Sequence, residues 1–431
     1  MRHSTNPRFI KRYLFNTLIF LSFVVIMFLL VKRWKYHSEL EFLQKLVDEN
    51  SKMIDEMGSL TPIGRKSKDA WRIPDVPEAR IFSAYFDPRP EVVLNEGSEA
   101  TRDNGWALIR IIAIIDVSYE GSEQTCYYKF PAKTPIDETD IFMEARSIAV
   151  KIIAKQENHG EMKYSASFVL CRLMTTENGK LPIQVTFSST AGKTPEELKK
   201  IDFVNVQYRR RNMSSDQSRF MGACIPSLHH NYDKYTSLVE FIEFYRMMGV
   251  NHFTFYKTSA SENVSRILDY YEKLGLVTII QWKLPPFYIF EQNLRYNGIF
   301  AALNDCLYRS TLVEGYEYIV NVDLDEFIVP RKHNNFHQLM TQLNPVSSHN
   351  ENVVFVFRNM FFYLTHLDSP VPQIPQDLPK LLLHTKTTRL KKIHQAYERS
   401  KYICVGYEVV ELGNHQVWFT KTVPWFIQYG K

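Results

Sequence analysis

The second half of the chain repeats a pattern of helix, glycine and strand, and this pattern most narrows the folds available to it. Apolar residues at helical spacing over 238–248 end at Gly249, and the β-branched and aromatic strand 252–256 follows. The same order recurs from 264 to 282, where Gly275 separates helix from strand. Helices that alternate with short strands predict an α/β domain built on a parallel sheet.

A third helix, expected over about 294–312, leads to the apolar strand that begins at Tyr318 and runs into Asp323, Asp325 and Glu326. If the strand continues, Asp323 and Asp325 lie on one face and Glu326 lies on the other. Ligands of open α/β sheets bind beyond the carboxyl ends of the strands. The carboxylates therefore stand where a nucleotide would bind, although an acidic surface turn is the simpler alternative.

Paired carboxylates suit a hard divalent ion such as Mn²⁺ or Mg²⁺, which would bridge the oxygens of a diphosphate. Asp325 is the best candidate for a direct ligand, and Asp323 would bind the ion through water or hold the ribose. Glu326 and His415 are candidates to orient those ligands by hydrogen bonds. Glu326 could equally cap a helix, and no residue can be chosen as the catalytic base from linear spacing.

Residues 79–215 contain short strand-like runs and no catalytic motif, so we expect a β-rich domain that precedes an α/β domain at 216–431. The chain has five cysteines and no Cys-x-x-Cys pair, which disfavours a zinc ribbon. One or two disulfides can form, and at least one cysteine must remain unpaired within the chain. The five are Cys126, Cys171, Cys224, Cys306 and Cys404.

Residues 14–31 form a run of 18 uncharged residues, at the short end of what crosses a bilayer. Basic residues follow it directly, which disfavours a cleaved signal peptide and favours a signal anchor, with a cytoplasmic tail at 1–13 and a stem at 32–78. The body would then be luminal, consistent with glycosylation sequons at Asn212 and Asn263.

Charge and missing motifs exclude several classes of function. Seven basic and no acidic residues lie within 1–35, so the rest of the chain has no positive excess, which argues against a nucleic-acid surface. Dinucleotide, phosphate-loop, zinc-protease and nucleophile-elbow motifs are absent, which disfavours dehydrogenases, kinases, zincins and hydrolases.

Aromatic residues late in the chain are candidates for sugar-stacking platforms, with core packing as the alternative. They are Phe361, Phe362, Tyr363, Trp418, Trp425 and Phe426.

Several segments together resemble glycosyltransferase family 92 between about Arg80 and His415. They are Phe82–Arg89, Phe241–Phe253, Ala302–Leu307, Asp323–Phe327, Lys401 and Gly413-x-His415. The resemblance implies a GT-A-like domain in a single-pass type II Golgi membrane enzyme. Such an enzyme transfers a hexose, galactose in characterised members, from a UDP-sugar to a glycan acceptor with inversion, and Asp323 and Asp325 would take the metal and donor roles.

The chain departs from the family pattern at its carboxyl end. The family continues past its late histidine to a His-Tyr-Arg segment, whereas this chain ends Val423–Lys431 with a different sequence. The alternative hypothesis is therefore an inactive form that serves as a membrane-anchored carbohydrate-binding or scaffold protein.

Overall fold

The computed structural model describes most of the chain in eleven segments. They are residues 7–60, 71–96, 105–130, 141–152, 162–174, 181–209, 219–288, 293–344, 352–369, 381–421 and 426–429. Sequon residue Asn212 and Trp425 lie outside these segments, and the side chain of Phe426 is likewise not described. Asn263 is exposed near the start of a helix, so glycosylation there stays a prediction.

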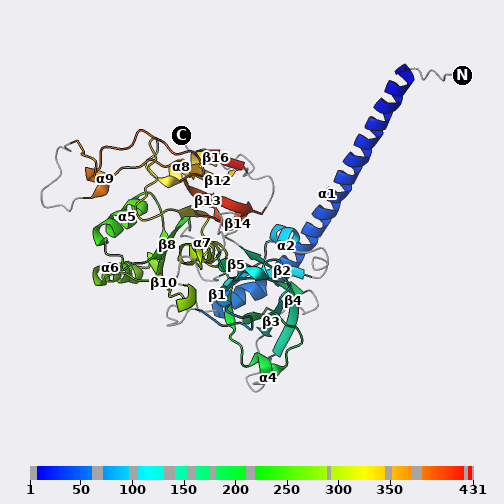
Figure 1. Cartoon of the computed structure of the whole chain (residues 1–431), viewed down its shortest axis with the longest axis horizontal. Coiled ribbons are helices and arrows are strands. Elements are labelled where there is room, and N and C mark those ends of the chain that lie inside the picture. Colours follow the sequence, from blue (N-terminus) through cyan, green and yellow to red (C-terminus); the bar gives the residue numbers. More distant parts are fainter. Residues whose placement is uncertain are drawn as a thin grey trace.

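One helix, α1 (Pro7–Leu60), continues from the expected span through the first half of the expected stem. Figure 1 shows it projecting from the body toward the amino terminus. In the part of the chain with described side chains, which begins at residue 21 and so omits 14–20, no helix meets the length and hydropathy needed to cross a membrane. Leu43 is buried against the first domain, so this part of the stem is docked rather than free.

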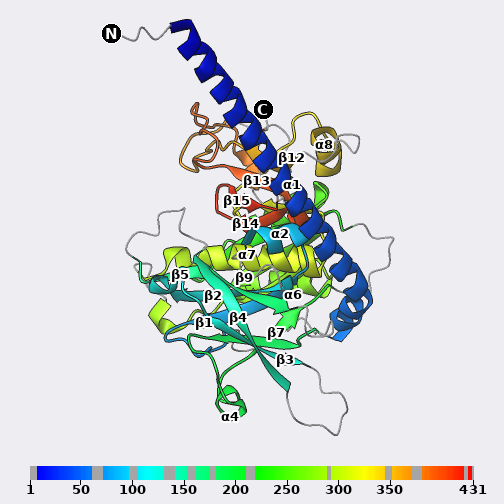
Figure 2. The same ribbon diagram turned by 90° about the vertical axis from the view of Figure 1, so that its right-hand side faces the viewer.

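The first domain is a closed barrel with strand order β1-β2-β5-β4-β3-β6-β7. The barrel closes through parallel pairing of β1 with β7, and its other pairs are antiparallel. A disulfide joins Cys126 to Cys171 in its wall. The strands, most of them labelled in Figure 2, are β1 (Arg80–Asp87), β2 (Gly105–Asp116), β3 (Thr125–Phe130), β4 (Ile141–Ile152), β5 (Tyr164–Met174), β6 (Gln184–Ser188) and β7 (Val204–Gln207).

The second domain is built on a mixed sheet of order β10-β9-β8-β11-β13-β12-β16. Strands β10, β9, β8 and β11 are parallel, and β13 runs antiparallel between β11 and β12. The α/β class predicted from the sequence is therefore confirmed. The strands are β8 (Met221–Leu228), β9 (His252–Lys257), β10 (Val277–Gln281), β11 (Tyr318–Asn321), β12 (Asn352–Phe357), β13 (Lys401–Val405) and β16 (Phe426–Tyr429), with a separate ribbon of β14 (Val409–Leu412) and β15 (Val417–Thr420).

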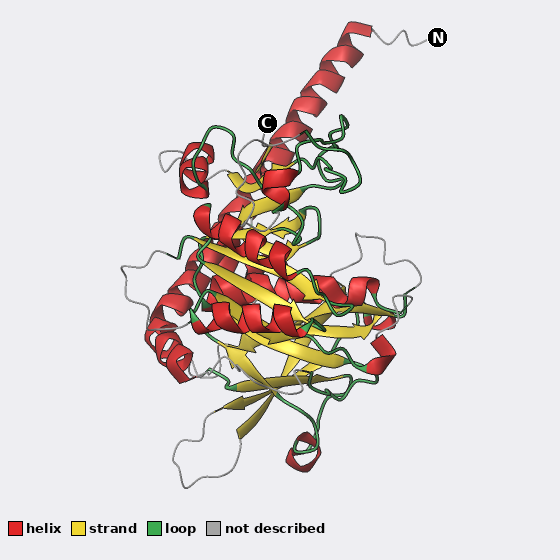
Figure 3. Ribbon diagram, turned by 90° about the vertical axis from the view of Figure 1, so that its left-hand side faces the viewer, coloured by secondary structure: helices red, strands yellow, loops and turns green. Residues whose placement is uncertain are grey.

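Helices cover both faces of this sheet (Figure 3). The amphipathic helices α5 (Tyr235–Met247) and α6 (Glu262–Lys273) bury their apolar residues on one face. On the other face lies α7 (Ile299–Tyr308), which is buried between the sheet and the barrel. The expected helix 294–312 is not one regular α-helix. Residues 296–298 have left-handed backbone, so α7 begins only at Ile299, and a π-helical segment follows its end at Tyr308. Shorter helices include α2 (Pro90–Glu96), α4 (Pro195–Leu198), α8 (Phe336–Leu343) and α9 (Leu382–Thr385).

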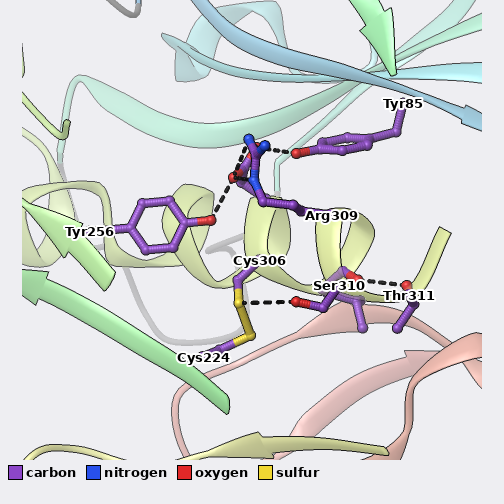
Figure 4. The surroundings of a disulfide bond; sticks show 9 residues. Tyr85, Cys224, Tyr256, Cys306, Arg309, Ser310 and Thr311 are labelled. Carbon is purple, nitrogen blue, oxygen red and sulfur yellow. Dashed lines mark hydrogen bonds and ion pairs between the residues drawn. A yellow bond between two sulfur atoms is a disulfide. The ribbon is translucent and has the colours of Figure 1, made fainter. Parts of the chain in front are cut away.

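A buried carboxylate on α7 joins the two domains. Asp305 accepts hydrogen bonds from the hydroxyl of Tyr85 on β1 and from that of Tyr256 on β9, both at 2.5 Å. It also pairs with Arg309, one turn further along the chain, at 3.1 Å. A second disulfide, Cys224–Cys306, attaches the same helix to β8 (Figure 4). With Cys404 free, the expectation of one or two disulfides and an unpaired cysteine is confirmed.

Candidate functional site

The order of the parallel strands marks one place on the sheet edge for a ligand. From β8 the chain moves outward through β9 to β10, and it then crosses to the other side of β8 to form β11. The direction of winding therefore reverses between β8 and β11. In open α/β sheets the crevice for the ligand lies at such a switch point, beyond the carboxyl ends of the two strands.

The carboxylates expected on a strand lie on a turn at this switch point. β11 ends at Asn321, and the chain turns at Leu324 and Asp325. Within the turn the Glu326 amide donates to the Asp323 carbonyl at 3.0 Å, while the Asp323 amide donates to the Glu326 carboxylate at 3.0 Å. Strand alternation was therefore the wrong basis for placing these residues, since the backbone is not extended here and Glu326 folds back toward Asp323.

A lysine from a distant part of the chain forms ion pairs with two of the carboxylates. The Lys401 ammonium lies 2.9 Å from Asp323 and 3.5 Å from Glu326, and it donates to the Asn414 side chain at 2.9 Å. Its side chain is 4% exposed and that of Asp323 is 39% exposed. Lys401 is the first residue of β13, and because β13 is antiparallel to β11, its start lies at the edge where β11 ends.

Glu326 is held within the protein rather than offered to solvent. Burial raises its pKa, the charge of Lys401 lowers it and the Asp323 charge raises it, for a net pKa of about 7. The Asn359 amide donates to its carboxylate at 3.0 Å. From α5, the Tyr245 hydroxyl donates to the Glu326 carbonyl at 3.0 Å. These contacts suit a residue that fixes the turn.

Asp325 is exposed at the tip of the turn, and its charge acts on Tyr232 in the loop that follows β8. In that loop His230 and Asn231 have φ values of +52° and +50°, a left-handed conformation that costs free energy in residues other than glycine. Tyr232 comes next, and burial, followed by the charge of Asp325, raises its pKa to about 12. Strained backbone of this kind concentrates at binding sites, and this loop follows β8, one of the two strands at the switch point.

The late histidine lies beside Asn414, near Lys401. The His415 Nδ1 donates to the Ser400 carbonyl at 3.2 Å, and burial and then the Lys401 charge lower its pKa. Beside it, Asn321 donates to the carbonyls of Gly413 and Asn414 at 3.3 and 3.2 Å. The side-chain oxygen of Asn321 is buried, and no donor among the described residues contacts it. His415 is thus linked to the carboxylates indirectly: it contacts Asn414, and Asn414 contacts Lys401, which pairs with Asp323.

The residues at the turn fit a metal ion only together with a ligand. Among the described residues no group of three or more histidines, cysteines or acids is arranged to hold a metal. Mg²⁺ and Mn²⁺ sites in phosphate-transferring enzymes use one or two carboxylates, with substrate phosphates and water completing the shell. Exposed Asp325 meets that requirement, whereas Asp323 already has Lys401 as its counter-charge.

Part of the chain matches a known protein family. Residues 219–422 match the sequence model of glycosyltransferase family 92. This part, just under half of the chain, is similar to glycosyltransferase family 92. It contains the carboxylate turn, Lys401 and His415, whereas the barrel precedes it.

Two further proteins are similar to parts of this chain. A β-1,4-galactosyltransferase, galt-1 of Caenorhabditis elegans, is 28% identical over 194 residues, which are 43% of this chain and 42% of the nematode protein. This chain thus spans less than half of the relative's length. The apo structure of the bifunctional glycosyltransferase WbbM matches over 37% of this chain and 27% of its own, at 14% identity and a TM-score of 0.19. A TM-score that low carries no argument about the fold.

The sequence located the carboxylates of the matched segment but not the groups around them. Lys401 was noted only as part of the family resemblance, and the roles of Asn414 and Tyr232 were missed. No local signal marks Lys401, since its place beside Asp323 depends on the pairing of β13 with β11. The loop of Tyr232 had a usable signal, because it follows a strand of the parallel sheet.

Proposed function

We propose that this chain is an inverting, metal-dependent glycosyltransferase that moves a hexose from a UDP-sugar to a glycan acceptor. Galactose is the first candidate for the hexose, since the nematode relative is named a galactosyltransferase. The observation that carries the proposal is the turn of Asp323 and Asp325 at the switch point between β8 and β11, within the matched segment. Inversion rests on the family resemblance alone.

In this proposal the two aspartates have different tasks. Asp325, which is exposed, holds Mn²⁺ or Mg²⁺ together with the donor diphosphate. When bound, the ion offsets the negative charge that develops on the departing UDP. Asp323, fixed by Lys401 at 2.9 Å, keeps part of its carboxylate exposed and accepts a hydrogen bond from a hydroxyl of the donor. Glu326 holds the turn, and the base that deprotonates the acceptor is unassigned.

The proposed Golgi membrane location rests on the sequence. Its basis is the uncharged run 14–31 with its basic flanks, together with the sequon at Asn263. The type II single-pass anchor stays a prediction, and the described part of α1 does not add to it.

Binding and turnover of a UDP-sugar by the purified chain test the proposal. UDP binding by calorimetry with and without Mn²⁺, and release of UDP from UDP-galactose, are measured for the unmodified chain and for Asp325→Asn. We expect Mn²⁺-dependent binding that Asp325→Asn weakens about tenfold or more, because a single neutral amide oxygen replaces a charged ligand. Asp269→Asn, on the exposed surface of α6, is the matched control.

Two results would contradict this function. One is the absence of UDP binding and UDP release with every hexose donor, in the presence of Mn²⁺ and Mg²⁺. The other is equal UDP affinity of Asp325→Asn and the unmodified chain. Glycan binding without any need for metal or UDP would then favour the carbohydrate-binding or scaffold alternative.

A further inference from the structure

The loop that follows β12 exposes four large apolar side chains within six residues. Phe362 is 44% exposed and Tyr363 47%, and the two leucines beyond them, Leu364 and Leu367, are 67% and 93% exposed. We call residues 360–367 the aromatic loop. Single exposed apolar residues are common on protein surfaces, but a contiguous group marks a place where something binds. Trp418, in contrast, is buried against Phe300, so for that residue core packing is confirmed.

The aromatic loop is fixed in place by the segment that returns to β13. The Leu390 amide donates to the Phe361 carbonyl at 2.8 Å, and the His394 amide donates to the Asn359 carbonyl at 3.0 Å. The rings of Phe361 and His394 meet edge to face, with centroids 5.0 Å apart. Just past the loop, the Asp368 carboxylate accepts from two backbone amides and pairs with Lys386. The exposed rings are therefore held on an ordered support, and little freedom is lost when a ligand docks on them.

The base of the aromatic loop touches the carboxylate turn. The Asn359 side chain donates to Glu326 at 3.0 Å, and Phe362 follows three residues later. Three residues span at most about 11 Å when fully extended. The backbone of Phe362 consequently lies within about 11 Å of that of Asn359, whose side chain contacts the turn where the donor is proposed to bind. An acceptor whose reactive hydroxyl lies at the turn would extend over this loop.

We propose that the aromatic loop is the acceptor subsite, with the side chains of Phe362 and Tyr363 packing on the sugar rings of the acceptor glycan. The apolar C–H face of a pyranose is complementary to the electron-rich face of an aromatic ring, and its equatorial hydroxyls need polar partners at the ring edge. The loop offers both kinds of group, because Thr365 and His366 are exposed among the aromatic residues. This inference rests on the proposed function.

Steady-state transfer kinetics on the full chain test the acceptor subsite. The variants are Phe362→Ala/Tyr363→Ala and the conservative Phe362→Tyr, and the readouts are the KM for neutral oligosaccharide acceptors and the affinity for UDP with Mn²⁺. For the double alanine variant we expect the acceptor KM to rise about tenfold or more and UDP affinity to stay unchanged. Phe362→Tyr should keep the acceptor KM. Tyr270→Ala, which removes an exposed ring from α6, is the matched control.

Three outcomes overturn the subsite. The first is an unchanged acceptor KM in the double alanine variant. The second is a loss of UDP affinity equal to the loss for the acceptor. The third is an unchanged acceptor KM combined with lost binding to phosphatidylcholine vesicles or lost self-association, which would assign the loop to a membrane or a second copy. If the unmodified chain binds no UDP, an oligosaccharide array separates the two claims, since array binding lost in the double variant supports the loop and retained binding refutes it.

Discussion

Replacement of Lys401 by methionine removes the counter-charge of the carboxylate turn while keeping the length of the side chain. At 2.9 Å, a unit charge pair in an environment of effective dielectric constant 20 is worth about 4 to 6 kcal/mol. Asp323 is 39% exposed, so solvent screens part of this attraction, and desolvation of the ammonium offsets more. We therefore expect Lys401→Met to lower the free energy of unfolding by about 2 kcal/mol.

A double-mutant cycle isolates the ion pair from other effects of the substitution. Urea unfolding is measured for Lys401→Met, for Asp323→Asn and for the two combined. Because the partner charge is already gone, the second substitution should cost less in the first variant's background, and the coupling free energy should be about 1 to 2 kcal/mol. UDP affinity with Mn²⁺ should fall in Lys401→Met, since Asp323 and Glu326 then repel each other and the turn that carries Asp325 loses its fixed geometry.

Lys421 provides a matched control for Lys401. It too is nearly buried and pairs with two carboxylates, Glu408 at 3.0 Å and Glu91 at 3.8 Å, but neither partner belongs to the turn. Lys421→Met should therefore lower stability and leave UDP affinity unchanged. The reasoning is refuted by a coupling free energy below about 0.5 kcal/mol between Lys401 and Asp323, or by equal UDP affinities of the two lysine variants.

Further predictions concern buried parts of the fold. Asp305→Asn leaves Arg309 without its counter-charge at the domain junction, so urea unfolding should show a loss of about 3 to 5 kcal/mol. Cys306→Ala, which opens the disulfide to Cys224, should cost up to about 4 kcal/mol because it frees a long loop in the unfolded chain, and thermal unfolding checks this. Burial alone would raise the pKa of Asp87, but Arg89 and then Arg110 lower it below its ordinary value. Its contribution to stability is therefore full above about pH 4 and is lost as the pH falls through the lower folded pKa, so Asp87→Asn should flatten the acid limb of the stability–pH curve.

The sequence by itself determined the local elements of this protein. Helical spacing and the glycine stops placed α5 and α6 within a few residues, because each helix buries one apolar stripe and each glycine adopts the positive φ that ends it. The same pattern gave the α/β class and located the carboxylates of Asp323 and Asp325 at a strand end, since residues adjacent in sequence must be adjacent in space.

Only the tertiary structure decided how those carboxylates are used. The turn at Leu324 replaces an extended strand because the Asp323 amide is taken by Glu326 and because Lys401 draws both carboxylates together. Lys401 reaches them only through the antiparallel pairing of β13 with β11, and such long-range pairing leaves no signature in the local spacing of residues. The exposure of Phe362 likewise depends on which surfaces the returning segment covers, so composition alone could not separate a sugar platform from core packing.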